Sequence, residues 1–279
     1  MRVSAYILVA DPAFLRASVR AYYDRVDEIV LSYDATSTSW TGTPLPVAEC
    51  LRIIDALDVE GKCRHLPGSY ARVREHPLDC DTYQRQEALD AASHDTDWVL
   101  QLDTDEVMLD PGAFFGALER ADATGASGLD YPSRWLYSNV GDDLFLESST
   151  RFWRARASYP GPMAVRAGTR LSLARQADVP LHRVDFRPWN TDPAHPHTAP
   201  VHAVIAPSAG IAHYSWVRDD ETMQRKFRWS GHAEAYSKPE VYRRWAGRQR
   251  RPLLTALGTP ARRDDWFRLS HISEPREEA

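Results

Sequence analysis

The segment Trp98-Val-Leu-Gln-Leu-Asp-Thr-Asp-Glu106 decides the interpretation of this chain. Its first five residues are mostly large and apolar, which is typical of a short strand buried inside a protein. Two acids, Asp103 and Asp105, follow directly at the predicted end of that strand. Ligands of parallel sheets bind outside the carboxyl ends of the strands, and hard cations prefer oxygen ligands. The segment therefore predicts a binding site at the edge of a sheet.

Around this segment, predicted strands alternate with predicted helices. Apolar runs that predict strands cover residues 3–10, 28–33, 63–66 and 98–102. Capping and periodicity signals place helix starts at Asp11-Pro12, Pro46, Asp81 and Asp110-Pro111. Alternation of this kind implies a mostly parallel central sheet flanked by helices, so the predicted fold class is α/β and Rossmann-like.

The second part of the chain has a different pattern. From Gly128 the sequence becomes extended and aromatic, and residues 179–207 are rich in proline and histidine. Further strands are expected at 201–205 and 211–216, followed by helices from Asp219 and from Pro239. No flexible linker is visible, so we expect residues 1–125 and 126–279 to be two halves of one compact unit.

Composition excludes several classes of protein. The net charge is -5, and basic residues form no long runs, which argues against nucleic acid as a partner. The three cysteines include no Cys-x-x-Cys pair and predict neither a disulfide framework nor a zinc knuckle. The first apolar run is too short for a membrane span and lacks the features of a signal peptide. A cytoplasmic protein without a membrane span is expected.

Four segments, taken together, resemble a known family. They are the first strand with Ala10 and Asp11, Tyr33-Asp-Ala-Thr-Ser37, Arg85-Gln-Glu-Ala-Leu89 and Leu102-Asp-Thr-Asp-Glu106. Their kind and order resemble family 2 glycosyltransferases and relatives with the GT-A fold. The resemblance covers about the first 110 residues. A weaker likeness extends to residues 211–218 and the helix that contains Lys226.

The resemblance implies a metal-dependent enzyme that moves a sugar from a nucleoside-diphosphate donor to a hydroxyl acceptor, a glycan or small metabolite, with inversion. Residues 1–125 would bind the nucleotide-sugar, and residues 126–279 would bind the acceptor. The residues that the resemblance assigns to the nucleotide are Ala10, Asp11, Asp34, Arg85 and Asp103. It assigns Mn²⁺ or Mg²⁺ to Asp105, with Asp103 beside it and His213 completing the site.

Other roles follow from the chemistry of the transfer. Arg218 and Lys226 could neutralise the departing diphosphate, since fixed cations stabilise developing negative charge. A carboxylate must take the proton of the acceptor hydroxyl. Glu147, which lies among aromatic residues, is the first candidate and Asp185 the second, but the family's usual Glu-Asp base motif is missing. The identity of the base therefore stays open.

Several of these assignments have alternatives. Asp103-Thr-Asp-Glu-Val107 also satisfies the signature of haloacid-dehalogenase-type phosphatases, with Asp103 as nucleophile and Asp142 and Asp143 on magnesium. That signature normally follows the first strand, whereas about three strands precede it here. A sugar-binding protein without activity is a further alternative. His213 could also be a packed core residue, and Lys226 could lie on a solvated helix face.

Overall fold

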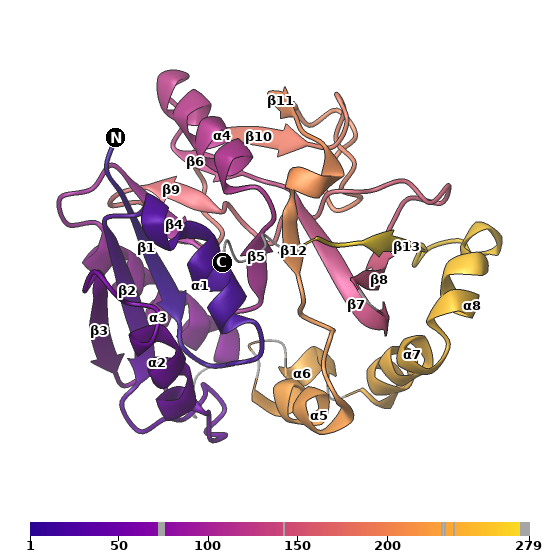
Figure 1. Ribbon diagram of the computed structural model, residues 1–279, viewed down its shortest axis with the longest axis horizontal. Coiled ribbons are helices and arrows are strands. Elements are labelled where there is room, and N and C mark those ends of the chain that lie inside the picture. The colour runs from indigo at the N-terminus through magenta and orange to yellow at the C-terminus, as the bar shows by residue number, and fades with distance from the viewer. Residues whose placement is uncertain (72–75, 142, 230, 232, 237, 274–279) are drawn as a thin grey trace.

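The computed structural model describes residues 1–71, 76–141, 143–229, 231, 233–236 and 238–273. Its larger sheet has eight strands: β1 (Val3–Leu8), β2 (Glu28–Asp34), β3 (Cys63–Gly68), β4 (Trp98–Gln101), β6 (Gly128–Asp130), β9 (Ala164–Arg166), β10 (Leu181–Asp185) and β11 (Ala203–Val204). They lie in the order β11-β10-β6-β9-β4-β1-β2-β3 (Figure 1). Within this sheet every pairing is parallel except the two that β9 makes with β4 and β6. The α/β class with a mostly parallel, Rossmann-like sheet is confirmed.

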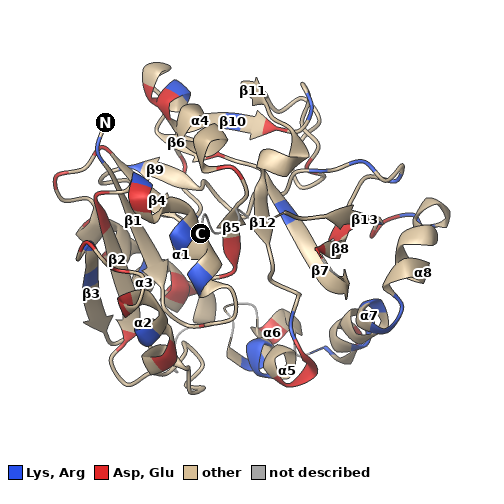
Figure 2. Ribbon diagram, in the orientation of Figure 1, with Lys and Arg blue, Asp and Glu red and all other residues tan. Residues whose placement is uncertain are grey.

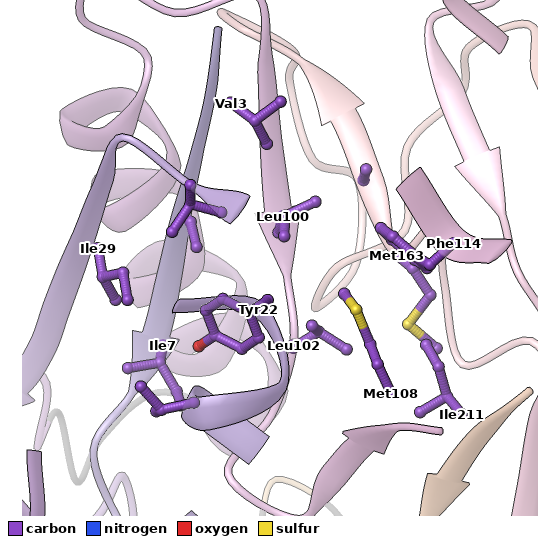
Figure 3. Packing of buried hydrophobic residues seen from close by; sticks show 14 of the residues in the cluster. Val3, Ile7, Tyr22, Ile29, Leu100, Leu102, Met108, Phe114, Met163 and Ile211 are labelled. Carbon is purple, nitrogen blue, oxygen red and sulfur yellow. The ribbon is translucent and has the colours of Figure 1, made fainter. Parts of the chain in front are cut away.

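Helices cover both faces of this sheet. They are α1 (Leu15–Tyr22), α2 (Val47–Asp55), α3 (Pro77–Ala92) and α4 (Pro111–Ala123). Helices α1, α2 and α4 share a core cluster with one set of β1 side chains, which includes Ile7, whereas α3 packs with the alternate set, which includes Tyr6. Figure 3 shows Ile7, Tyr22 and Leu102 within the first cluster. Full burial of such a side chain contributes about 1.5–3 kcal/mol.

Two predicted helix starts are wrong, and the reasons are local. Helix α1 begins at Leu15, four residues after Asp11, whose carboxylate accepts from the amide of Ala13 in the preceding turn and from Arg218. Helix α3 begins at Pro77 rather than Asp81, and His76 accepts the hydrogen bond that caps it. The predicted cap at Asp110 is confirmed, since its carboxylate accepts from the amide of residue 113 at 2.9 Å.

A second sheet branches from the first. It contains β5 (Glu106–Met108), β7 (Ser133–Gly141), β8 (Leu144–Ser148), β12 (Ile211–His213) and β13 (Phe267–His271), in the order β13-β8-β7-β12-β5. The chain passes between the sheets several times, and two of these passages are short: from β4 to β5 through residues 102–105 and from β6 to β7 through residues 131–132. The two acids therefore occupy a bend where both sheets meet. Because β6 and β9 to β11 join the large sheet, the two halves of the sequence are interleaved.

The remaining helices lie after β12. They are α5 (Asp220–Trp229), α6 (Ala233–Tyr236), α7 (Pro239–Arg250) and α8 (Pro252–Leu257), with short 3₁₀ turns η1 (Tyr23–Arg25), η2 (Pro207–Ala209) and η3 (Thr259–Ala261) elsewhere. The predicted start near Asp219 is confirmed, since its carboxylate accepts from the amide of Thr222. No helix in the described part of the chain combines the length and the apolar character that crossing a bilayer requires.

Candidate functional site

A cavity of about 540 Å³ opens at the carboxyl edge of β1, β2 and β4. Acids that follow these strands line it: Asp11 after β1, Asp34 at the end of β2, and Asp103 with Asp105 after β4. Ala10 lies on the same wall. The strand ends that the sequence predicted as a site therefore converge on one cavity.

Of the acids that line this cavity, Asp105 faces the most basic side chains. Its Oδ2 accepts from the Lys226 ammonium at 2.7 Å and from the Arg218 guanidinium at 3.1 Å. Its Oδ1 lies 3.5 Å from Nε2 of His213. Burial alone would raise the pKa of this carboxyl, but Lys226, His213 and Arg218 together hold it well below its ordinary value. Asp105 is therefore ionised and held in a fixed position.

Arg218 links the two acids at the ends of β1 and β4. Its Nε and Nη2 donate to Oδ2 of Asp11 at 3.0 and 2.9 Å, and Nη1 donates to two backbone carbonyls. The side chain is 2% exposed, and it does not line the cavity. The predicted role of Arg218 as a ligand of the nucleotide is not supported by this position, because its side chain is buried behind the cavity wall, where it fixes Asp11 and Asp105.

Lys226, in contrast, does line the cavity. Its ammonium donates to Asp105 and to the backbone and hydroxyl oxygens of Ser215, at 3.1 and 3.2 Å. Lys226 lies on helix α5, 121 residues after Asp105 in the sequence. The structure thus places one of the two predicted cations where a ligand can reach it.

Arg85 and Asp103 form a second charged pair on the same wall. The Arg85 guanidinium donates to Asp103 at 2.9 Å and to Asp81 at 2.7 Å. Its remaining nitrogen, Nη1, is buried and has no hydrogen-bond partner among the described residues. Burial opposes ionisation of Asp103, but the charge of Arg85 prevails and lowers the pKa of Asp103. Arg85 therefore provides a largely buried positive charge at a wall of the cavity.

His213 is oriented by a buried ion pair that the sequence did not reveal. Arg175 donates from both terminal nitrogens to Glu106, and the Glu106 side chain is 0% exposed. Glu106 in turn lies 3.6 Å from Nδ1 of His213, a nitrogen without a hydrogen-bond partner among the described residues. The His213 ring therefore lies between two acids, with Glu106 on its Nδ1 side and Asp105 on its Nε2 side.

These donors can be tested against the expected divalent cation. Asp105 Oδ1 and His213 Nε2 face each other, which fits two ligands of one cation. Among the described residues, no group of three or more His, Cys, Asp or Glu side chains is placed to hold a metal ion. Cations that act on phosphates commonly have one or two protein ligands and take the rest from phosphate and water. The residues therefore fit a cation shared with a phosphate ligand.

The end of β2 provides the other part of this wall. Asp34 accepts hydrogen bonds from Thr36 and from the amides of Tyr70 and Ala71. Burial would raise the pKa of Asp34, but these hydrogen bonds lower it to about 2. Tyr33 and Trp40 line the cavity beside it. The carboxylate thus fixes the loops that shape an aromatic recess.

The opposite wall comes from the second part of the chain. Trp135 and Tyr137 of β7, Tyr159, and Asp192 from the loop after β10 line it. Asp192 accepts from the amides of Tyr159 and Ala194 at 3.1 and 2.9 Å. Sequence reasoning missed Asp192, since its loop has no periodic pattern that would place it at the site.

Both predicted bases lie outside the cavity. Glu147 is 1% exposed and ion-paired with Arg134 at 2.7 Å and with Arg268. Asp185 is 0% exposed and accepts hydrogen bonds from the hydroxyls of Tyr159 and Thr191 and from three backbone amides. Neither side chain lines the cavity. Their positions give them structural roles, so the interpretation of either one as a base must be corrected.

The phosphatase alternative also lacks its geometry. Asp143 lies in the turn between β7 and β8 and does not line the cavity with Asp103. Asp142 lies outside the described residues. The acid pair that this alternative requires is therefore not assembled by the residues that the structure describes.

Comparisons with known proteins add little. No protein-family model matches the chain, and no curated protein matches it. Among solved structures, 4-diphosphocytidyl-2C-methyl-D-erythritol synthase from Anaerococcus prevotii is similar with a TM-score of 0.36 and 15% identity, over 60% of this chain and 71% of its own. Mannose-6-phosphate isomerase from Helicobacter pylori gives a TM-score of 0.30 and 13% identity, over 54% of this chain and 57% of its own. Likenesses this weak carry no functional argument.

Proposed function

We propose that the protein is a glycosyltransferase that moves a sugar from a nucleoside-diphosphate donor to a hydroxyl acceptor. The observation that carries this proposal is the pairing of Asp105 with Lys226 and His213 at the edge of the sheet, inside a cavity walled by both sheets. One wall offers charged groups suited to a diphosphate, and the other offers aromatic faces suited to sugars.

The donor would lie along the ends of β1, β2 and β4. Its nucleoside fits the recess beside Tyr33, Asp34 and Trp40, where an aromatic face and a carboxylate are close together. Its diphosphate fits near the positive charges of Lys226 and Arg85, which both line the cavity. A divalent cation held by Asp105 and His213 would supply further positive charge there.

Lys226 has a specific task in this scheme. When the bond between sugar and diphosphate breaks, negative charge develops on the departing oxygen. A preorganised ammonium in a water-poor site stabilises that charge more than solvent does. Ser215 and Asp105 hold the Lys226 ammonium in place beforehand, so the transition state has little reorganisation to perform.

Asp192 is our candidate for the base. Of the described acids after residue 125, it alone lines the cavity, so it faces the donor wall from the acceptor side. A carboxylate in that place can accept the proton of the acceptor hydroxyl during attack. Asp192→Asn should therefore leave nucleotide binding unchanged and slow turnover of the matching nucleotide-sugar by about 10²–10⁴-fold.

The proposal is tested by thermal unfolding with UDP, GDP, dTDP and ADP, each with and without Mn²⁺. A ligand at 100 times its dissociation constant stabilises the folded state by about 2.7 kcal/mol. One of these nucleotides should raise the melting temperature by several degrees, and Mn²⁺ should increase the effect. If none of them changes the melting temperature under either condition, the proposal fails.

Two variants separate the site from the rest of the chain. Asp105→Asn should abolish the part of the nucleotide effect that depends on Mn²⁺. Asp110→Asn makes the same chemical change at an exposed helix cap outside the cavity, where asparagine also caps well, and should respond like the wild type. An Asp105→Asn protein that keeps its full Mn²⁺ response would remove Asp105 from the metal site.

A further inference from the structure

The end of the molecule formed by α7 and α8 is strongly basic. Residues 239–263 contain seven arginines and one acid, Glu240, in a chain whose net charge is -5. The arginines are Arg243, Arg244, Arg248, Arg250, Arg251, Arg262 and Arg263. Figure 2 shows basic residues along α7 and around its junction with α8, and Figure 1 places α8 at the outer edge of the fold.

The same end exposes large apolar side chains. On α8, Leu253, Leu254 and Leu257 are 53%, 62% and 71% exposed, and on a neighbouring loop Phe152 and Trp153 are 74% and 44% exposed. The Trp153 indole donates to a carbonyl of α8 at 2.8 Å, so the loop lies against the helix. These five are almost half of the eleven large apolar side chains exposed in the described chain. Such clustering marks an interaction surface, whereas single exposed side chains do not.

Charged and apolar groups share one groove here. Six of the arginines line it together with Leu254 of α8, against two acids, Asp264 and Asp265. Arg248 is paired with Asp265 at 2.8 Å, whereas Arg243, Arg244 and Arg251 pair with no acidic side chain among the described residues. The surface therefore has uncompensated positive charge directly beside protruding leucines.

We propose that this surface, defined by α7, α8 and the loop at residues 151–154, docks on an anionic lipid membrane. Arginines that contact lipid headgroups while leucine, phenylalanine and tryptophan enter the acyl boundary are the chemistry of interfacial binding. Nucleic acid would use the arginines but would leave the leucines exposed. A second copy of the chain would bury the leucines but would bring two arginine clusters together.

Docking there would bear on the cavity. The Arg248 guanidinium lies over the ring of Tyr137, 5.0 Å from its centre, and Tyr137 lines the acceptor wall. Arg248, which belongs to the docking surface, thus contacts a residue of the acceptor wall. A membrane at this end would favour acceptors carried by lipids, a consequence that rests on the proposed function, although the docking itself does not.

The test is co-sedimentation of the full chain with vesicles of phosphatidylcholine alone or of phosphatidylcholine containing phosphatidylglycerol. The chain should sediment with the anionic vesicles, not with the neutral ones, and added salt should weaken the effect. Arg243→Gln combined with Arg244→Gln and Arg251→Gln should lower partitioning on the order of a hundredfold, since each arginine near an anionic surface contributes about 1 kcal/mol. Leu253→Ser with Leu254→Ser and Leu257→Ser should lower it on the order of tenfold.

The control removes equal charge elsewhere. Arg16→Gln with Arg25→Gln and Arg52→Gln changes three exposed arginines on or beside α1 and α2 and should sediment like the wild type. Circular dichroism and thermal unfolding verify that each variant folds. The proposal would be overturned if the control variant lost as much vesicle binding as the Arg243, Arg244 and Arg251 variant. It would also be overturned if the chain sedimented equally with neutral vesicles, or with neither kind of vesicle. The proposal would also fail if the chain bound no vesicles but bound a duplex oligonucleotide even after the leucine changes. It would fail as well if the chain bound no vesicles but formed a dimer that the leucine changes dissociate.

Discussion

Replacing Asp105 by asparagine removes one negative charge from the buried network and keeps the shape of the side chain. Asp105 faces two cations, Arg218 at 2% and Lys226 at 13% side-chain exposure. Removing one partner of a buried ion pair costs about 3–5 kcal/mol. Arg218 keeps Asp11, and Lys226 keeps its bonds to Ser215, so we expect a loss of about 3 kcal/mol, near the lower end of that range.

Asp103 provides a matched comparison within the same bend. Its side chain is 30% exposed, and its partner Arg85 retains Asp81 when the charge of Asp103 is removed. Asp103→Asn should therefore cost only about 1 kcal/mol. Urea unfolding at neutral pH measures both variants, and the melting temperature of Asp105→Asn should fall by roughly 6–12 °C. Equal losses in the two variants would refute the view that Asp105 is the buried centre of the network.

Two further predictions concern Asp34 and Gly161. Thr36 and two backbone amides lower the pKa of Asp34 from 3.8 to about 2, so ionised Asp34 stabilises the fold above pH 4. That contribution is about 1–2 kcal/mol after allowance for solvent screening, and it is lost as the pH falls from 4 to 2. Urea titrations at each pH should show this loss of unfolding free energy in the wild type but not in Asp34→Asn. The prediction is wrong if the unfolding free energies of the two proteins change in parallel with pH. Gly161 has a φ of +146°, and an added Cβ would lie 3.0 Å from the carbonyl oxygen of Arg175, so Gly161→Ala should cost about 1–3 kcal/mol by thermal unfolding. Gly125→Ala, at a φ of +72° in open space, should cost less; the reverse order would show that this contact is not tight.

Local patterns in the sequence predicted the frame of the site. Apolar runs marked β1, β2 and β4, since a strand buried on both faces must be apolar throughout. Acids directly after those runs marked the carboxyl edge of the sheet, where the cavity lies. Helix starts were less secure, because a residue such as Asp11 can cap a helix or reach a distant partner, and the sequence does not state which occurs.

What the sequence by itself determined was the α/β class, the order of the strands along the chain and the acids that follow them. Only the tertiary structure decided which side chains meet: Arg218 with Asp11, Arg175 with Glu106, and Asp192 opposite the donor wall. It also decided that Glu147 and Asp185 are held in ion pairs and hydrogen bonds away from the cavity. The physical reason is range. Secondary structure follows from neighbours along the chain, whereas these contacts join residues far apart in the sequence, and no local periodicity encodes the path of the chain between them.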